Sequence, residues 1–453
     1  MEVQNPKLSA LLSKEKQKIL ACVHCGLCLE SCPTYRATGN ENDGPRGRIY
    51  LMRAVEEGKL NPDSAAFERH IDRCLGCRAC EQVCPSGVEY GNLLELSRAE
   101  IRAARKSRGI FYSLQSWLLR SIWPYPGRLG LLFWLARSFR ETRLLRLALK
   151  SGIPEMLSHR LAFAFALLEA SRPVKLRFSE TLKPATGKFP KTGKMTECRA
   201  EQFSGCVTAG LFGRVNKATV RVLQHNGFNV DVPQGQTCCG ALHLHSGDIE
   251  GARELARRNI GAFNDHEAEI VTNAGGCGAM LVNYGHLLAD DPEFAEPADL
   301  FSSRVKDISQ VIDLEAIDDR CQIEGGPVTY DASCHLLHGQ KAGSEARRLV
   351  ASVAGEKFVS LGECEVCCGG AGVYNLLEPD LASRVLHEKL NNVRATGAEL
   401  LATGNPGCHM QIGAGALMAG TGLKVCHPIE ILDAFYERAG VYERDQKASG
   451  SFR

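Results

Sequence analysis

The chain has 453 residues and a mass of 49.4 kDa, more than a single hydrophobic core usually accommodates, so two or three domains are expected. A composition of 44% hydrophobic and 23% charged residues is typical of a folded protein and excludes a disordered tail or a fibre. The formal net charge of +2 gives no general attraction to nucleic acid, and no nucleic-acid partner is expected. The 20 cysteines are the unusual feature, because the chain is too long for a small disulfide-stapled scaffold.

The amino-terminal segment MEVQNPKLSALLSKEKQKIL is interrupted by charges and lacks the apolar core of a secretory signal. No run of about 18 apolar residues occurs, so no transmembrane helix is predicted. We therefore expect a cytoplasmic protein. Its cysteines are then more suited to metal ligation or redox chemistry than to disulfides.

Residues 1–108 are expected to form a first, mostly helical domain. A polar helix over residues 6–20 leads into a first cysteine cluster at residues 22–32. Residues 46–57 carry apolar side chains at helical spacing, and Gly58 follows them as a helix terminator. A second cysteine cluster occupies residues 74–84, and helical spacing resumes over residues 93–104.

Residues 109–195 are expected to form a helical connector and a linker. All three tryptophans lie within 109–150, with Glu141 as the only acid and these basic residues: Arg120, Arg128, Arg137, Arg140, Arg143, Arg146 and Lys150. Such a basic, aromatic, amphipathic stretch suits a membrane surface or a partner groove. The alternative is a connector whose arginines lie in water while Trp and Leu pack inward. Residues 173–195, with three prolines and many lysines, indicate an extended linker or arm.

The remainder of the chain contains an internal repeat. Three landmarks recur about 130 residues further along: SGCV, TCCG and NAGGCG at Cys206, Cys238 and Cys277 return as ASCH, VCCGG and GNPGCH at Cys334, Cys367 and Cys408. Each copy alternates β-like runs with helical patterns, namely Glu269–Thr272 and Val328–Tyr330 with Asp248–Phe263 and Leu381–Arg394. This pattern predicts two α/β domains at residues 196–322 and 323–445, with cysteines in the loops after strands and a tail at 446–453.

Eight cysteines form two runs of the same spacing, Cys22, Cys25, Cys28 and Cys32 before Pro33, and Cys74, Cys77, Cys80 and Cys84 before Pro85. This is the spacing of bacterial ferredoxins, in which three thiolates surround one cubane and the fourth cysteine ligates the other. The expected ligands are Cys22, Cys25, Cys28 and Cys84 for one [4Fe-4S] cluster, and Cys74, Cys77, Cys80 and Cys32 for a second. A structural zinc scaffold is the alternative, but zinc sites do not need this spacing twice.

Each repeat supplies four further candidate cluster ligands: Cys206, Cys238, Cys239 and Cys277 in the first copy, and Cys334, Cys367, Cys368 and Cys408 in the second. Adjacent cysteines can grip one multinuclear cluster, and the flanking glycines leave room for it. One or two further clusters are therefore candidates. The alternative is a set of reduced, buried cysteines in a decayed site.

This cysteine pattern is similar to the CCG domain of heterodisulfide reductase subunits, anaerobic glycerol-3-phosphate dehydrogenase and lactate-utilisation proteins. In that family the last element is usually CxxC, whereas here Met280 and Gln411 stand where the second cysteine would be. Where a relative of this family has five cysteine thiolates in one site, each site of this chain therefore has four. Cys364 is a candidate substitute in the second copy.

The order of one ferredoxin-type region and two CCG domains resembles the iron–sulfur subunits of bacterial glycolate oxidase. The stretches NAGGCGAMLVNYGHLL, CHLLHGQ, CCGGAGVYNLLEP and GNPGCHMQI carry this resemblance. It implies a complex, peripheral at the inner face of the membrane, in which a flavin subunit oxidises glycolate to glyoxylate. The iron–sulfur subunit would carry the electrons toward a quinone-level acceptor. The alternatives are an iron–sulfur subunit for lactate or glycerol-3-phosphate oxidation, or a heterodisulfide-reductase-like subunit.

Six histidines near the CCG cysteines could be ligands or proton donors, although core histidines bonded to backbone are the favoured interpretation: His243, His245, His335, His338, His409 and His427. Cys198, Cys321 and Cys426 have no motif partners and are expected to be small buried residues. The sequence has no Ser-His-Asp motif, Walker loop or G-x-G-x-x-G unit. We therefore assign no catalytic residue, flavin or NAD to this chain and expect the hydride chemistry on a partner.

Overall fold

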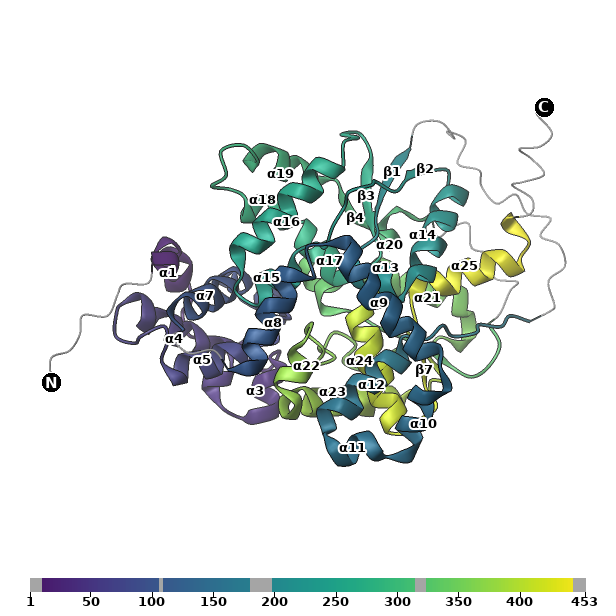
Figure 1. Ribbon diagram of the computed structural model, residues 1–453, viewed down its shortest axis with the longest axis horizontal. Coiled ribbons are helices and arrows are strands. Elements are labelled where there is room, and N and C mark those ends of the chain that lie inside the picture. The colour runs from purple at the N-terminus through teal and green to yellow at the C-terminus, as the bar shows by residue number, and fades with distance from the viewer. Residues whose placement is uncertain (1–9, 106–108, 180–197, 314–322, 443–453) are drawn as a thin grey trace.

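The computed structural model describes residues 10–105, 109–179, 198–313 and 323–442 (Figure 1). Within residues 10–105 the chain is helical and has no strand. Its elements are α1 (Ala10–Lys14), α2 (Lys16–Leu20), α3 (Pro33–Thr38), η1 (Glu41–Asp43), α4 (Pro45–Glu56), α5 (Ala65–Asp72), α6 (Ala79–Gln82) and α7 (Tyr90–Ala104). The expected mostly helical amino-terminal region is confirmed.

Helix α4 shows how the local sequence sets these elements. Pro45 begins the helix, where its missing N–H needs no partner, and Gly58 follows the end with a φ of 72°. The apolar stripe of α4 packs into a buried core with α5 and α7. The single helix expected over residues 6–20 is instead two short helices, α1 and α2, and residues 6–9 lie outside the described part.

The first repeat contains a sheet covered by helices. Its elements are β1 (Arg199–Phe203), α13 (Cys206–Leu211), α14 (Gly213–His225), β2 (Asn229–Asp231), α15 (Ala241–His245), α16 (Ile249–Ala262), β3 (Glu269–Thr272), α17 (Gly275–Leu281), α18 (Tyr284–Leu287), α19 (Ala295–Ser303), β4 (Val305–Asp307) and α20 (Ile308–Val311). The four strands are parallel, in the order β2-β1-β3-β4.

The second repeat has the same plan. Its elements are β5 (Val328–Asp331), η3 (His335–Gly339, a π-helical turn), α21 (Gly343–Ala354), η4 (Gly355–Lys357), α22 (Tyr374–Leu377), α23 (Pro379–Ala395), β6 (Leu400–Thr403), α24 (Pro406–Met418), β7 (Lys424–Cys426) and α25 (Pro428–Arg438). Its three strands are parallel in the order β5-β6-β7. A single parallel bridge from Val328 to Phe358 occupies the position that β2 has in the first repeat.

The two sheets confirm the α/β character of the repeats. Strand β3 begins and ends where the sequence predicted, and β5 extends one residue further. Both are almost fully buried, as expected for parallel strands covered by helices on both faces. The chain leaves the ends of β1, β3, β5 and β6 directly before the segments that contain Cys206, Cys277, Cys334 and Cys408.

Between the amino-terminal region and the first repeat, the described residues 109–179 form five helices: α8 (Ile110–Ser121), α9 (Pro126–Glu141), α10 (Arg143–Ser151), α11 (Ile153–Leu157) and α12 (His159–Ala170). They lie across the face seen in Figure 1, over the two repeats. Helix α9 inserts Leu129 and Phe133 into the core, and α12 packs along α24. No helix in the described ranges is long and apolar enough to cross a membrane.

The connector helices leave many apolar side chains in solvent. Trp117 and Trp134 are each 55% exposed, whereas Arg140 is buried and donates hydrogen bonds to Ser171. The alternative interpretation, in which Trp and Leu pack inward while the arginines lie in water, is therefore wrong for these residues. Of the expected linker at 173–195, residues 173–179 are described, and Phe178 forms an antiparallel bridge with Ile323.

The three cysteine-containing regions pack closely against one another. Tyr374 of the second repeat donates a hydrogen bond to the Arg73 carbonyl at 3.0 Å. The Gly275 N–H of the first repeat donates to the Gly404 carbonyl of the second at 2.9 Å. A side chain at Gly247, just after α15, would overlap the Arg98 backbone of α7, so only glycine fits this contact.

Candidate metal centres

Four cysteines from both ferredoxin-like runs surround one small cavity near the protein surface. Cys22, Cys25, Cys28 and Cys84 line it, and it also reaches Cys80. Burial raises the pKa of the Cys22 thiol, and Cys84 and Cys25 raise it further because an added negative charge beside them is unfavourable. Cys25 is exposed. Cys84 of the second run thus lies with three cysteines of the first run.

The remaining four cysteines form a second, buried set. Burial raises the pKa of the Cys80 thiol, and its neighbours Cys77, Cys74 and Cys32 raise it further. The structure therefore brings Cys32 of the first run beside three cysteines of the second. The grouping is the one the motif predicts, and the ligation itself stays a prediction.

Local backbone geometry wraps the chain around each set. Gly26 and Gly76 lie between cysteines with φ of 87° and 63°. His24 and Arg78 also adopt positive φ, at 56° and 61°, which residues with a side chain rarely do. Backbone strain of this kind is concentrated at functional sites. The positive φ angles of His24 and Arg78 therefore support a functional role for both cysteine loops.

The second set has hydrogen-bond donors aimed at its sulfur atoms. The Gly76 N–H lies 3.4 Å and the Tyr90 hydroxyl 3.5 Å from Cys74 Sγ, and both donate to it. Donors to ligating sulfurs stabilise a thiolate and adjust the reduction potential of a cluster that it holds. The donor set therefore fits an iron–sulfur cluster.

A buried arginine lies beside the second set. Arg48 is 0% exposed and donates to the His70 carbonyl at 2.7 Å and to Thr34 Oγ1 at 3.1 Å. Burial alone would lower its pKa, but Cys74 and the other negative groups around it raise it. We did not predict this charge from the sequence. The available signal was its spacing, because Arg48 shares the apolar stripe of Met52 and Val55.

The first repeat brings its four candidate cysteines together. Cys206 Sγ lies 3.5 Å from Cys238 Sγ, and Cys239 interacts with both Cys238 and Cys277. The hydrogen bond with Cys238 lowers the pKa of the Cys239 thiol, but Cys277 and burial together outweigh it, so the pKa is raised overall. Met280, at the position of the missing fifth cysteine, is buried in the same apolar cluster as Cys238 and Cys239.

The second repeat repeats this arrangement. Cys334 interacts with Cys367, and Cys368 interacts with Cys367 and Cys408. Gln411, at the other missing position, is fully buried and accepts a hydrogen bond from Asn375 at 2.7 Å. Cys364 is half-buried, and the charge that most affects its pKa, after burial, is that of Lys389 rather than that of a cysteine.

A buried ion pair lies beside the cysteines of the second repeat. Lys389 Nζ is 2.8 Å from Asp331 Oδ1, with the two side chains 0% and 2% exposed. Burial alone would lower the pKa of Lys389, but Asp331 raises it, and Cys368 and Cys367 add to the rise. Lys389 therefore holds a fixed positive charge beside this site, and no sequence pattern pointed to it.

The second cysteine set of the amino-terminal region touches the site of the second repeat. Cys77, Cys334 and Cys367 belong to one buried cluster with Leu75. His335 Nε2 is 3.1 Å from the carbonyl of Gly76, so the two sites also share a hydrogen bond. The inner cysteine set and the four-cysteine site of the second repeat thus lie next to each other.

Two histidines confirm the interpretation of core residues bonded to backbone. His243 Nε2 lies 2.9 Å from the Leu119 carbonyl, and His427 Nε2 lies 2.9 Å from the Asn273 carbonyl. His338 is different, because neither buried ring nitrogen has a partner within the described chain. Burial lowers the pKa of His338 to about 4 and that of His409 to about 3, so both rings are neutral near pH 7.

The cysteines outside the motifs differ in their burial. Cys426 is buried, as expected, but Cys198 is exposed and the expectation for it is wrong. Cys198 lies just before β1, where its carbonyl accepts a hydrogen bond from Asn229 while its side chain faces solvent. Cys321 lies outside the described residues. Across the described ranges, no group of three or more His, Cys, Asp or Glu is placed to hold a single metal ion.

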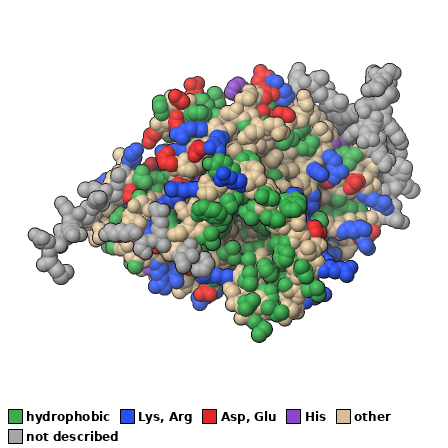
Figure 2. All heavy atoms as spheres, viewed as in Figure 1, with side chains coloured by type: hydrophobic (Ala, Val, Ile, Leu, Met, Phe, Trp, Pro, Cys, Tyr) green, Lys and Arg blue, Asp and Glu red, His purple; other side chains and the backbone are tan. Residues whose placement is uncertain are grey.

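Two surfaces carry exposed apolar side chains. The first, called the cluster-proximal surface below, consists of exposed residues in or near the segments that carry the outer cysteine set: Leu20, Val23, Leu27, Tyr50 and Val83. Val23 and Leu27 line the small cavity together with Cys25. The second, called the connector patch, consists of Leu114, Trp117, Leu131, Trp134, Leu135, Ile153, Met156 and Leu157. Figure 2 shows hydrophobic side chains gathered over α8, α9, α11 and α12, around a hollow in this face.

Comparison with known proteins follows the same division of the chain. A family model described as a 4Fe-4S dicluster domain matches residues 18–88, and one described as a cysteine-rich domain matches residues 200–282 and 328–413. The chain is 38% identical over 431 residues to the probable glycolate oxidase iron-sulfur subunit of Bacillus subtilis (strain 168), covering 94% of this chain and 95% of that relative. It is 32% identical over 423 residues to the glycolate oxidase iron-sulfur subunit of Escherichia coli (strain K12), covering 92% and 94%. It is also 34% identical over 236 residues to lactate utilization protein A of Oceanobacillus iheyensis, covering 52% of this chain and 96% of that relative.

Proposed function

Because the chain belongs to the family of glycolate oxidase iron-sulfur subunits, we propose that it carries electrons from a flavin subunit, which oxidises glycolate to glyoxylate, toward a quinone-level acceptor. The observation that carries this proposal is the pair of four-cysteine sets, one at the surface and one buried. The chain carries [4Fe-4S] clusters in its dicluster domain. When bound, these clusters supply one-electron transfer.

The ligands follow from the two sets. Cys22, Cys25, Cys28 and Cys84 hold the outer cluster, and Cys74, Cys77, Cys80 and Cys32 hold the inner one. Tyr90 and the Gly76 N–H stabilise the Cys74 sulfur, and Arg48 supplies a nearby positive charge. A fixed positive charge favours the reduced, more negative state, so Arg48 raises the potential of the inner site.

The repeats supply the next ligands. Cys334, Cys367, Cys368 and Cys408 form a four-thiolate site directly beside the inner set, and Lys389 balances part of its negative charge. Cys206, Cys238, Cys239 and Cys277 form the equivalent site of the first repeat. The convergence of four thiols in each copy supports a third and a fourth cluster over decayed sites.

The cluster-proximal surface is the docking site for the flavin subunit. Cys25 is exposed, and Val23 and Leu27, which line the same small cavity, are 68% and 60% exposed. Exposed apolar side chains around a redox site are typical of a surface that a protein partner covers. Electrons entering here reach the outer set first.

The connector patch contacts a bilayer that carries anionic headgroups. Its apolar residues recur at i, i+3 and i+4 on the outward faces of α9 and α11. Around them, six basic side chains are exposed, Arg120, Arg128, Arg137, Arg143, Arg146 and Lys150, against the exposed acids Glu141 and Glu155. Apolar side chains with a basic surround match the interface of an anionic membrane.

Lactate is the second candidate substrate, because lactate utilization protein A shares half of this chain. The site of hydroxyacid oxidation lies on the partner in either case. Anaerobic purification with the partner subunits, followed by assays with glycolate and with lactate, tests the proposal. Glycolate is expected to reduce the acceptor faster than lactate, and a complex that turned over lactate alone would contradict the glycolate assignment.

A further inference from the structure

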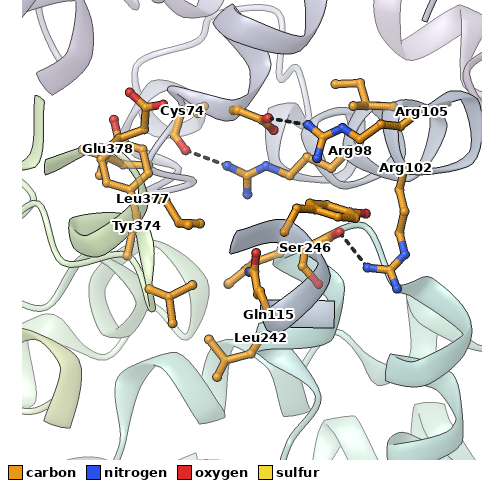
Figure 3. Close-up of a pocket in the computed structure, with 17 residues that line it drawn as sticks. Cys74, Arg98, Arg102, Arg105, Gln115, Leu242, Ser246, Tyr374, Leu377 and Glu378 are labelled. Atoms are coloured by element: carbon orange, nitrogen blue, oxygen red, sulfur yellow. Dashed lines mark hydrogen bonds and ion pairs between the residues drawn. The ribbon is translucent and has the colours of Figure 1, made fainter. Parts of the chain in front are cut away.

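A cavity lies where the amino-terminal region, the connector and both repeats meet. Its volume is ≈ 310 Å³, within the range of about 300–1,000 Å³ that small-molecule sites occupy. Cys74, which we assign to the inner cluster, forms part of its wall (Figure 3). The other walls come from α7, α8, α15 and α22.

Apolar surface makes up most of the cavity wall, and polar and charged side chains from several elements converge on it. Leu75, Ile101, Leu242, Val373 and Leu377 supply the apolar surface. Figure 3 shows Arg98 and Gln115 reaching in from different helices, with the Arg98 guanidinium donating to the Cys74 carbonyl at 2.6 Å. That one bond uses one of five donor hydrogens, so the guanidinium retains donors for a ligand.

The charges of the wall are largely paired, which favours a neutral ligand. Arg105 pairs with Asp72 at 3.3 Å, and Arg102 pairs with Asp248 at 3.3 Å. Arg98 makes no ion pair within the described part of the chain. Arg98 is thus the cation with donors to spare, and the carboxylates of Asp72 and Glu378 also line the cavity. Because these carboxylates would repel an anionic ligand, the carbonyl oxygens of a neutral ligand suit Arg98 better than a carboxylate or a phosphate.

The cavity also borders the connector patch. Leu377 both lines the cavity and is exposed, and Gln115 belongs to α8, the helix that also carries the patch residues Leu114 and Trp117. A ligand with a flat polar ring and a long apolar tail could place the ring inside and the tail along the patch. A bilayer covering the patch would hold such molecules at high local concentration.

We propose that this cavity binds the ring of a membrane quinone, with Arg98 and Gln115 donating to its carbonyl oxygens. This inference rests on the proposed function and names the position of its acceptor. Reduction of the quinone to the quinol takes two electrons, supplied by hydroxyacid oxidation in the complex, and two protons, supplied by water. Two O–H bonds form as the two C=O double bonds become C–O single bonds and the ring becomes aromatic, and the two protons that hydroxyacid oxidation releases return to the solvent.

Filling the cavity tests the proposal. Leu242→Trp and Val373→Trp, each in the complete complex in liposomes, are expected to lower reduction of a short-chain quinone analogue at least tenfold. Leu300→Trp, an exposed position on α19, is the matched control and is expected to leave the rate unchanged. Glycolate-driven bleaching of the clusters, recorded without quinone, is expected to persist in all three variants. Unchanged quinone reduction in both filled variants, with normal folding, would overturn the site.

A binding experiment provides a readout that needs no turnover. A photoreactive azidoquinone, irradiated with the unreduced wild-type complex, is expected to label peptides containing residues 112–119 or 371–378. Leu242→Trp is expected to abolish this labelling. Labelling confined to other peptides of this chain or to a partner would overturn the site. Failure of glycolate to reduce any cluster in the wild type would instead overturn the proposed function, so the two failures are distinguishable.

Discussion

The Cys77 thiol of the amino-terminal region lies beside the Cys367 thiol of the second repeat. Burial raises the pKa of Cys77, and Cys367 raises it further. Both residues are buried in the same cluster. A cysteine of the inner set is therefore adjacent to a cysteine of the second repeat, although the two are 290 positions apart in the sequence (367 − 77). This adjacency makes the second repeat the natural continuation of an electron path.

The inner cluster should be essential for electron exit but not for hydroxyacid oxidation. Cys77→Ser is expected to abolish glycolate-driven reduction of the final acceptor, because one thiolate of the inner site is lost. Glycolate should still reduce the flavin of the partner, which stopped-flow absorbance would record. Cys198→Ser, which alters an exposed cysteine outside the motifs, is the control. Loss of flavin reduction in an assembled Cys77→Ser complex would contradict this division of labour.

The repeat sites should contribute to the iron content. Cys367→Ser is expected to lower the iron and acid-labile sulfide of the anaerobically purified complex while the ferredoxin-type clusters remain. Cys426→Ser, also at a buried cysteine of the second repeat, should leave both values unchanged. Equal iron and sulfide in the two variants would mean that the second repeat holds no cluster.

The cluster-proximal surface should govern binding of the flavin subunit. Leu27→Glu places a charge in the proposed interface and is expected to weaken binding by about 1–2 kcal/mol, or roughly tenfold. Titration of the partner by calorimetry would measure the change. Leu131→Glu, on the connector patch, is the control and should bind the partner normally. Normal partner binding by Leu27→Glu would place the interface elsewhere.

The connector patch should govern binding to lipid. The double variant Leu131→Glu/Leu135→Glu is expected to reduce binding to vesicles containing anionic lipid by at least about tenfold. Raising the salt concentration should weaken wild-type binding, because exposed arginines provide part of the attraction. Vesicle sedimentation would measure both effects, with Leu27→Glu as control. Wild-type binding by the double variant would leave the patch without a role at the membrane.

The buried Lys389–Asp331 pair should be required for stability. Lys389→Met is expected to destabilise the protein by about 3–5 kcal/mol, because it leaves the Asp331 carboxylate buried and uncompensated. The double variant Lys389→Met/Asp331→Leu removes both charges and should recover much of the loss. Chemical unfolding of the anaerobic protein would measure the differences. A double variant no more stable than Lys389→Met would show that the lost charge balance is not the cause.

The sequence predicted what depends on spacing. The two cysteine runs, with gaps of two, two and three residues, predicted which cysteines lie together in each set. The internal repeat predicted two α/β units. Both patterns can be recognised because they are local or periodic in the sequence. The packing of one unit on another was not predictable. The hydrogen bond of His335 to Gly76 and the burial of Lys389 depend on surfaces that meet only after folding. For the Trp-rich connector the sequence left two interpretations open, because hydrophobicity does not distinguish a core face from one that a membrane or partner covers; the exposure of Trp117 and Trp134 favours the second.

The most direct test of the account is the rate of glycolate-dependent acceptor reduction as a function of the iron bound to this subunit. Chelation and anaerobic reconstitution with iron and sulfide would prepare complexes over the full range of iron content. We predict that turnover rises with iron content and approaches zero for the iron-free subunit, while glycolate still reduces the partner flavin. Full turnover by a colourless, iron-free subunit mixed with its partners would contradict the claim that this chain carries electrons on iron–sulfur clusters.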